Sequence, residues 1–532
     1  MTSLTWPFAS FNMVSTRFLV YLTALAASSV VVDAWLPPLV AKGNKFFDSD
    51  SGEEFRIKGM AYYPRPNSGE LAGVTGYDWT TDDHEDVWGP HLEVMKDLGV
   101  NTVRLYSVDP NRPHDKFMCA ASEAGIYVIV GMVAPCENCA VPDLAPPSCY
   151  PSELFTRVQM IYNAFAVYDN VLGFSVGNEN NMPTAKDDTG TLSAPCVKAL
   201  LRDTKAYASS CAGDIRQVPI GLDLADITPR EQWIQYYDCV AEEDINTSAD
   251  WLGFNPYVEC DPVKHTSYEQ STGLQKLMSD YKAVNYSQPI MFGEFGCNKG
   301  ANTVDGYENQ RSFLDAKWMN EEAEMTAEIV GGNVFEFSTE IANLANEKKI
   351  SKKADPGNYG VGYFDPATCD NDKTVCEFTP YPEYENLKKA YTTTKASTNK
   401  LDDFKPTRNV VLTCPKGMSV DLPKAPDVEK LACYTAQPVC SGKKSNNGDK
   451  SIKGRRKDTR LTPGITLKDS GSDGGDSPGT VHADSGKDGE GDDAKPGSAS
   501  SKTPAPSAAS RMAALPALVS VASAVVALVV VA

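Results

Sequence analysis

Two glutamates at the ends of short apolar runs are the residues of this sequence best suited to chemistry. Glu179 ends the stretch Val171–Asn178, and Glu294 ends the stretch Pro289–Gly293, so the two acids lie 115 residues apart. Such runs predict strands buried on both faces, and parallel-sheet proteins place their chemistry at the carboxyl ends of strands. Two carboxyl groups meeting there would form a glycosidase site. The alternative is that each glutamate only pairs with a cation at its strand end.

The distance between these two carboxyl groups would decide the stereochemical outcome at the anomeric carbon of the sugar. A gap of about 5–5.5 Å indicates a retaining mechanism through a glycosyl-enzyme, and about 6.5–9.5 Å indicates inversion. In either case one group must be protonated and the other ionised, so their surroundings must separate their pKa values. Asn178, beside Glu179, is placed to hydrogen-bond a sugar hydroxyl.

Other polar residues are expected to end strands on the same rim. Arg104 and Tyr106 close a second predicted strand, and Tyr257 and Glu259 follow a sixth. A tyrosine hydroxyl or an arginine near the nucleophile would hold its charge and geometry.

Aromatic side chains near the strand ends could stack on sugar rings; the candidates are Tyr62, Tyr63, Trp79, Trp88, Tyr257 and Phe337. Packing in the core is the alternative for each of them, and it is favoured for Trp88 and Phe337. Asp109 and Asp223 are as well suited to capping a loop as to a role in the site.

Composition and motifs exclude several other classes of protein. The five histidines lack metal-ligand spacing, and neither HExxH nor GxSxG occurs, so neither a metal mechanism nor a serine mechanism is supported. No metal and no cofactor are expected. A net charge of −20 argues against a nucleic-acid partner, whereas a neutral polymer would tolerate it.

Apolar runs alternate with helical patterns across residues 35–398, which predicts a (β/α)₈ TIM barrel of the α/β class. An open doubly wound sheet is not favoured, because no GxGxxG turn follows the first strand. The expected strands are Phe55–Tyr62, Asn101–Tyr106, Ile126–Val133, Val171–Gly177, Val218–Leu222, Asp250–Tyr257, Pro289–Gly293 and Gly332–Phe337.

The two ends of the chain carry the patterns of processing signals. Residues 1–34 resemble a signal peptide, with Arg17 before an apolar region and Val32-Asp33-Ala34 at the cleavage site. Residues 510–532 end in an apolar tail behind a short spacer, which predicts a removed glycosylphosphatidylinositol (GPI) attachment signal. The attachment residue is expected between Gly497 and Ser507, and a tail-anchored membrane helix is the alternative.

Two further segments separate the barrel from the tail. Residues 399–442 hold Cys414, Cys433 and Cys440 and predict either a disulfide-tied cap or an ordered tether. Residues 443–509 are rich in Ser, Gly, Asp and Pro, and such a composition predicts a disordered linker.

Cysteine and asparagine patterns agree with a secreted, surface-held protein. All 14 cysteines follow the predicted cleavage site, so several disulfides in an oxidising compartment are expected. Cys136 and Cys139 are expected to belong to a disulfide-bearing loop. Asn246 and Asn285 begin glycosylation sequons.

Several motifs together resemble a known family over about residues 45–365. They are NTVRLYSVDP at 101–110, HD at 114–115, AGIYVI at 124–129, YDNVLGF at 168–174, GNE at 177–179, FGEFGCN at 292–298 and NYG at 358–360. They are similar to those of the cell-wall, GPI-anchored β-1,3-glucanosyltransferases of glycoside hydrolase family 72.

The resemblance implies a retaining reaction with Glu179 as acid/base and Glu294 as nucleophile. It also implies that Asn178, Tyr106 and Tyr257 hold the donor sugar. An enzyme of this kind cleaves β-1,3-glucan and passes the new reducing end to another glucan chain.

The chain departs from the family pattern near the expected rim. Tyr63 and Arg65 stand where Gln and Gly are usual, Gly131 stands for an Asp, and Phe335 and Phe337 stand for tyrosines. These differences leave a secreted retaining β-glucanase as the second hypothesis. A third hypothesis is an inactive carbohydrate-binding wall protein.

Overall fold

The structure is a computed structural model, and it describes residues 35–259, 265–297, 311–342, 359–441 and 443–445. The predicted signal peptide, the attachment tail and nearly all of the predicted linker lie outside the described residues. Within the described ranges, no helix combines the length and the apolarity needed to cross a membrane.

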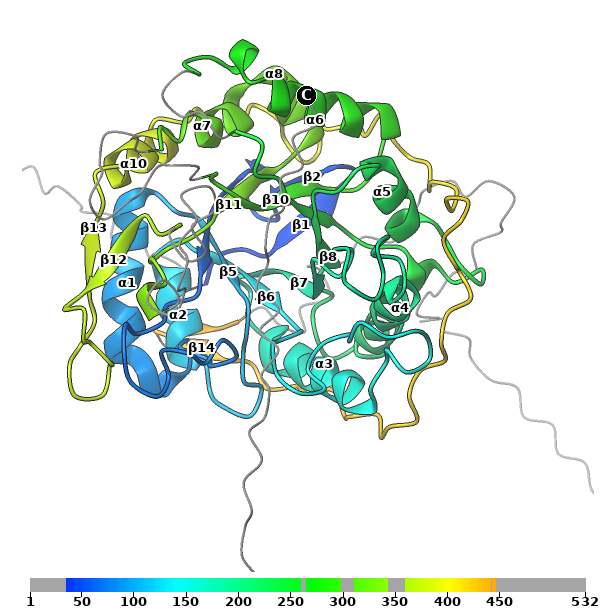
Figure 1. The fold of residues 1–532 in the computed structure, drawn as a ribbon, viewed down its shortest axis with the longest axis horizontal. Coiled ribbons are helices and arrows are strands. Elements are labelled where there is room, and N and C mark those ends of the chain that lie inside the picture. The colour runs from blue at the N-terminus through cyan, green and yellow to red at the C-terminus, as the bar shows by residue number, and fades with distance from the viewer. Residues whose placement is uncertain (1–34, 260–264, 298–310, 343–358, 442, 446–532) are drawn as a thin grey trace, which may run out of the picture. The chain divides into compact units, whose positions relative to one another are not determined.

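Eight parallel strands close into a barrel in which each strand pairs with the next, and the last pairs with the first (Figure 1). The TIM-barrel prediction is therefore confirmed. The strands are β4 (Ile57–Tyr62), β5 (Thr102–Leu105), β6 (Tyr127–Gly131), β7 (Val171–Asn178), β8 (Ile220–Ala225), β9 (Leu252–Asn255), β10 (Ile290–Phe295) and β11 (Gly331–Val334).

Helices follow the strands on the outside of the barrel: α1 (Glu85–Leu98), α2 (Asp115–Glu123), α3 (Ser152–Phe165), α4 (Ala194–Ser210), α5 (Arg230–Asp238), α6 (Thr272–Val284), α7 (Leu314–Glu321), α8 (Ala323–Glu328) and α10 (Tyr384–Thr392). The helical segment after β10 is divided into α7 and α8. Glu322 adopts an extended backbone between α7 and α8, which ends the first helix and begins the second.

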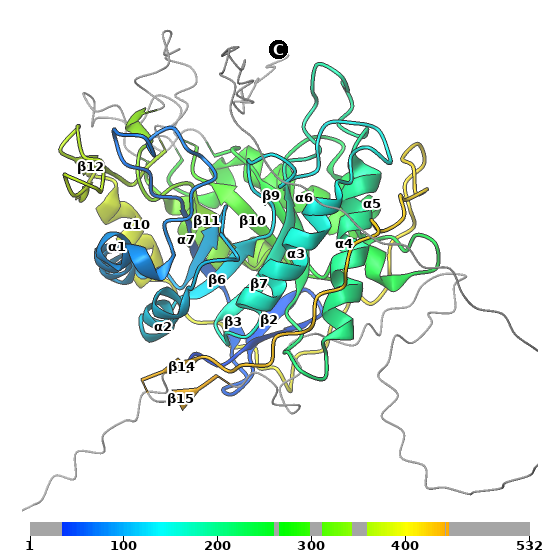
Figure 2. The same cartoon turned by 90° about the horizontal axis from the view of Figure 1, so that it is seen from below.

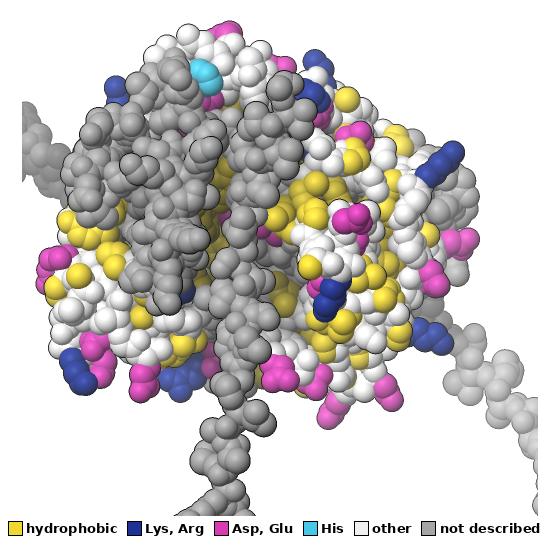
Figure 3. All heavy atoms as spheres, viewed as in Figure 1, with side chains coloured by type: hydrophobic (Ala, Val, Ile, Leu, Met, Phe, Trp, Pro, Cys, Tyr) yellow, Lys and Arg dark blue, Asp and Glu magenta, His cyan; other side chains and the backbone are white. Residues whose placement is uncertain are grey.

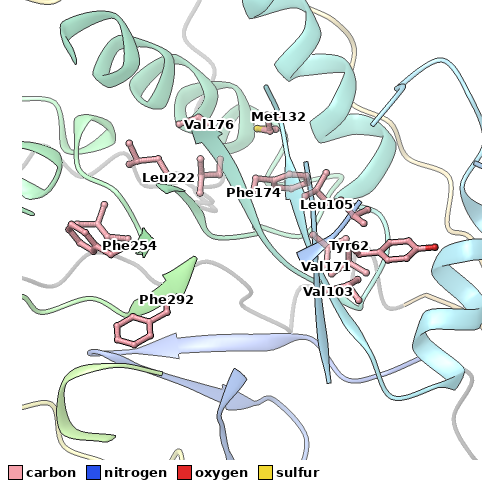
Figure 4. Packing of buried hydrophobic residues seen from close by; sticks show 14 of the residues in the cluster. Tyr62, Val103, Leu105, Met132, Val171, Phe174, Val176, Leu222, Phe254 and Phe292 are labelled. Atoms are coloured by element: carbon pink, nitrogen blue, oxygen red, sulfur yellow. The ribbon is translucent and has the colours of Figure 1, made fainter. Parts of the chain in front are cut away.

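Alternation along the strands separates an apolar layer from a polar interior. Val103 and Leu105 of β5 pack in the main hydrophobic cluster together with residues of the surrounding helices, as do Phe174 and Val176 of β7 (Figure 4). Arg104, between the two β5 residues, is therefore directed into the barrel. The same alternation directs acidic residues of other strands into the barrel interior.

The amino-terminal end of the barrel is closed by an antiparallel sheet of β1 (Leu39–Lys42), β2 (Lys45–Asp48) and β3 (Glu54–Phe55). Leu39 and Phe46 of this sheet join a second apolar cluster with strand residues such as Ile129 and Met291. Figure 2 shows β2 and β3 below the barrel strands. Because this end is filled by apolar side chains, the polar groups of the interior gather at the opposite, carboxyl end.

Residues 399–441 form a segment that we call the C-terminal strap. It has almost no regular secondary structure, and in Figure 1 it runs along the outside past α5 and α4 (yellow to orange). Three disulfides fasten it: Cys414–Cys239, Cys433–Cys211 and Cys440–Cys119. The segment is thus an extended chain that disulfides hold against the barrel domain.

The remaining described disulfides lie within the barrel domain: Cys136–Cys139, Cys149–Cys196 and Cys369–Cys376. The first of them lies in the loop after β6, where the sequence predicted a disulfide-bearing loop.

The two predicted glycosylation sites differ in accessibility. Asn285 is exposed at the carboxyl end of α6. Asn246 is only 8% exposed, and its Nδ2 donates a hydrogen bond to Oδ1 of Asp244 at 3.0 Å. A glycan on Asn246 would have to displace this packing.

We therefore expect Asn285, and not Asn246, to carry a glycan when the protein is secreted from a eukaryotic host. Asn285→Gln should remove one N-glycan from the intact mass, whereas Asn246→Gln should leave the mass of the glycoform unchanged apart from the substitution. Site occupancy measured by glycopeptide mass spectrometry checks this directly. Full occupancy at Asn246 would contradict it.

Candidate active site

Glu294 is carried into the barrel mouth by an irregular end of β10. The register with β11 shifts between Phe292 and Phe295, and such bulges re-aim side chains next to functional sites. Gly293 is required there because a Cβ would collide with Oδ1 of Asp223 and would lie 2.6 Å from Oδ1 of Asn255. The backbone of β10 thus approaches its neighbours closely at the residue before the acid.

Both carboxylate oxygens of Glu294 accept hydrogen bonds. The Tyr106 hydroxyl donates to Oε1 at 2.8 Å, and Arg104 Nη1 donates to the same atom at 2.9 Å. The Tyr257 hydroxyl donates to Oε2 at 2.8 Å. Burial raises the pKa of both tyrosine hydroxyls well above their ordinary value, so they remain protonated donors. Glu294 itself is 7% exposed, and its carboxylate is fixed from both sides.

Glu179 is directed to the same region by a left-handed backbone conformation, with φ of +53°. This conformation is uncommon for a residue other than glycine, and it is found at functional sites where surrounding contacts impose it. Here the Glu179 amide donates to the Asp223 carbonyl at 3.0 Å, and Asn255 Nδ2 donates to Glu179 Oε1 at 2.8 Å. The register between β7 and β8 also shifts just before Asn178.

A chain of hydrogen bonds joins the two glutamates. Arg104 Nη2 donates to Oδ1 of Asn178 at 2.8 Å, and Asn255 Nδ2 contacts the same oxygen at 3.4 Å. Since Asn255 also binds Glu179 and Arg104 also binds Glu294, the two acids share one network.

The two carboxyl groups have different surroundings. Burial, and next the neighbouring Glu294 carboxylate, raise the pKa of Glu179 to about 7, against an ordinary value of 4.5. Glu179 receives one described side-chain hydrogen bond, whereas Glu294 receives three. One group therefore retains a proton near neutral pH beside a group held by donors, which is the division of roles that acid and nucleophile need.

Two residues of this network were not identified from the sequence. Asp223 could, from the sequence, equally have been a residue that caps a loop, but it is buried. It forms an ion pair with Arg104 at 3.1 Å and accepts a hydrogen bond from the Ser175 hydroxyl at 2.7 Å. Asn255 was not singled out at all. The sequence does contain a feature that could have identified them: each is a polar residue at an inward-facing position of an otherwise apolar strand. These strands read GLDLA at 221–225 and LGFN at 252–255.

Most of the candidate stacking residues are in the core. Tyr62, Trp79, Trp88 and Phe337 are almost fully buried, so they are wrong as sugar platforms, although core packing was already favoured for the last two. Tyr63 is half-buried; its hydroxyl donates to the Thr75 carbonyl at 3.0 Å, and its ring centroid lies 5.8 Å from that of Tyr106.

Other predicted rim residues lie apart from the glutamate network. Glu259 contacts His265 at 2.7 Å. Asp109 accepts hydrogen bonds from Asn111 in its own loop, as expected of a cap.

The departures from the family pattern are not all on the rim. Phe337 lies in the core, whereas Phe335 packs edge-on against Tyr106 at 6.3 Å between ring centroids. Arg65 is buried, forms an ion pair with Glu340 and lies 5.1 Å from the Tyr63 ring centroid. The expectation that these substitutions all touch the rim is therefore wrong for Phe337.

Comparison with known proteins decides the family. The model of the glucanosyltransferase family, glycoside hydrolase family 72, matches residues 28–355. The chain belongs to this family. The 1,3-beta-glucanosyltransferase GAS5 of Saccharomyces cerevisiae is 33% identical over 397 residues, which are 74% of this chain and 69% of that protein. The gas4 enzyme of Schizosaccharomyces pombe is 34% identical over 59% of this chain and 64% of its own length. This chain thus spans about two thirds of the length of these two relatives.

Solved structures show the same fold. Saccharomyces cerevisiae Gas2p in complex with laminaritriose and laminaritetraose is 27% identical, with a TM-score of 0.56, covering 74% of this family 72 chain and 78% of that protein. A complex of ScGas2 with a small compound gives a TM-score of 0.57 at the same identity and coverage.

Charged side chains are dispersed over the coloured part of one face of the molecule. On the face drawn in Figure 3, Lys and Arg side chains lie singly among acidic ones and do not gather over one element. Among the described residues, no group of three His, Cys, Asp or Glu side chains is arranged to hold a metal ion.

The raised pKa of Glu179 predicts a pH-dependent effect of Glu179→Gln on stability. A carboxyl whose folded pKa is raised stabilises the fold below its unfolded pKa, and this contribution is lost as pH rises through the folded pKa. The wild type should therefore lose about 1–3 kcal/mol of unfolding free energy between pH 4.5 and 7 that the variant keeps. Denaturant unfolding of both proteins across this range measures the difference.

The exposed Glu137→Gln variant controls for the loss of one surface charge. A constant difference between wild type and Glu179→Gln over the whole pH range would contradict the assigned pKa.

Proposed function

We propose that this chain is a retaining β-1,3-glucanosyltransferase that cleaves one β-1,3-glucan and joins the new reducing end to another. The observation that carries the proposal is the shared network of Glu179 and Glu294, in which one carboxyl keeps a proton and the other is held by three donors. The family, the relatives named 1,3-beta-glucanosyltransferase and the laminari-oligosaccharides bound to Gas2p support β-1,3-glucan as the substrate.

The reaction follows in two displacements. Glu179 gives its proton to the glycosidic oxygen while a Glu294 oxygen bonds to the anomeric carbon, which breaks the glycosidic bond and releases the leaving chain. The carboxylate of Glu179 then takes the proton of an acceptor hydroxyl as that oxygen attacks the anomeric carbon and displaces Glu294. Two inversions give net retention, and Glu179 is again protonated.

The surrounding residues have separate roles in this scheme. Arg104, Tyr106 and Tyr257 hold the nucleophile in place through the hydrogen bonds to its two oxygens. Asn178 lies between Arg104 and Asn255, beside the acid, and is assigned to a hydroxyl of the reacting sugar. Tyr63 is assigned to the sugar-binding rim next to Tyr106.

We also propose that the protein is secreted and held on the outer surface of the membrane by a GPI anchor. The signal-peptide pattern of residues 1–34 and the apolar tail of residues 510–532 support this location. The disulfides that fasten the strap agree with an oxidising compartment.

A product-length profile tests the proposed reaction. Purified protein given reduced linear β-1,3-gluco-oligosaccharides should form products longer than the starting sugar, because a second sugar chain intercepts the glycosyl-enzyme. Chromatography with mass detection separates the lengths. Only shorter products from active protein would establish a hydrolase instead, and no products at all would favour a binding protein.

The pH dependence of this activity tests the role of Glu179. Since the acid must be protonated at the first step, kcat/KM should fall as pH rises through about 7, in line with the raised pKa of Glu179. Glu179→Gln should lower kcat by a factor of about 10²–10⁴, because amide nitrogen does not give up a proton to the leaving oxygen. Wild-type activity of this variant would contradict the assignment.

A further inference from the structure

A groove of about 680 Å³ lies between the C-terminal strap and helices α2 and α3. Its volume is within the range of small-ligand sites. It is lined by Tyr434 and Val439 of the strap and by Arg112, Asp115, Met160 and Tyr168 of the barrel domain, among others. This groove has no part in the two-glutamate site.

The strap segment over the groove is fastened at both ends. Cys433 is bonded to Cys211, and Cys440 is bonded to Cys119. The amide of Tyr434 also donates to Oδ1 of Asn163 at 3.1 Å. A ligand would therefore meet a wall that is already ordered, which reduces the entropy lost on binding.

Between the two disulfides, the strap nevertheless exposes large side chains to solvent. Tyr434 is 52% exposed and Val439 is 53% exposed. A tyrosine ring presents an apolar face together with a polar hydroxyl, and it gives large contact area for little conformational entropy.

The charged side chains named among the groove's lining already have partners. Arg112 pairs with Asp83, and Asp115 accepts a hydrogen bond from the Tyr168 hydroxyl at 2.8 Å. The lining thus combines aromatic and aliphatic surface with hydrogen-bonding groups and without a surplus of either charge. A neutral ligand with many hydroxyls and apolar C–H faces fits this lining better than an anionic polymer does.

A second cavity shares one lining residue, Arg112, with the groove. It has a volume of about 360 Å³ and is also lined by Ser107 and Asp109. Ser107 directly follows Tyr106, whose hydroxyl binds Glu294. Arg112, which lines both cavities, lies in the loop that leads from Tyr106, after β5, to α2.

We propose that the groove under the strap is a second, non-catalytic binding site for a neutral β-glucan chain, which holds long substrates to the enzyme. The inference rests on the proposed function for its choice of polysaccharide. It assigns to the strap a contact with the polymer, in addition to its structural role.

Binding to particulate linear β-1,3-glucan tests the proposal without turnover. In the full chain carrying Glu179→Gln, adding Tyr434→Ala and Val439→Ala should raise the Kd about fivefold or more, as loss of an aromatic anchor does. Tyr434→Phe, which keeps the ring, should retain most of the affinity. Val375→Ala is the matched control, because Val375 is 60% exposed and lies outside the groove. An unchanged Kd in the double variant would overturn the proposal.

Activity separates this proposal from the proposed reaction. With an active Glu179, the double variant should raise the ratio of KM for long glucan to KM for a short oligosaccharide by a similar factor. If the wild type does not elongate short oligosaccharides, the proposed reaction fails, while the Kd comparison still decides the groove.

Hydrogen exchange identifies a different occupant. The backbone amides of Thr435 and Ala436 should gain protection when long glucan is added to the full chain. Protection that is already present before glucan is added would overturn the proposal. If this protection falls when the protein is diluted, a second copy of the chain covers the groove. If the protection persists on dilution, the tail of the same chain covers the groove.

Discussion

The guanidinium of Arg104, buried inside the barrel, is the group on which the arrangement of the site depends. It is 3% exposed and contacts Glu294, Asp223, Asn178 and the Tyr106 hydroxyl. Burying a cation costs free energy unless charges and hydrogen bonds compensate for it, and these partners come from four different strand ends. The requirement works in both directions, because Asp223 and Glu294 would be uncompensated buried acids without the arginine. The barrel must therefore close in one register for all of these groups to be satisfied.

The fold could be predicted, and the two acids could be singled out as candidates, because both depend on short-range patterns. Apolar runs such as Val171–Val176 and the helical periods between them specify buried strands and covering helices in order. The acids were recognisable because each directly ends such a run. The positions of α7 and α8 could not be separated in this way, since the break at Glu322 follows from its backbone conformation and not from a glycine or proline.

The rest of the site depends on which side chains meet across the barrel. Asp223 and Asn255 are single polar residues in apolar strands, and only the closed barrel shows that they contact Arg104 and Glu179. Gly293 is ordinary in the sequence, yet it leaves the space that Asp223 and Asn255 occupy. Conversely, Tyr62 and Trp79 had suitable chemistry for sugar stacking, but packing against neighbouring rings and His91 or His84 uses their surfaces.

The disulfides of the strap also determine where a mechanical load would enter the molecule. A pull on the chain beyond Ser445 first reaches Cys440, whose bond to Cys119 passes the force into α2, 321 residues earlier in the sequence. Cys433 and Cys414 provide two further covalent points, at the end of α4 and after α5. The strands that carry Glu179 and Glu294 lie outside this load path. A protein that is tethered to a surface by its C-terminus and holds a polymer in the groove under the strap could thus transmit tension without distorting the catalytic geometry.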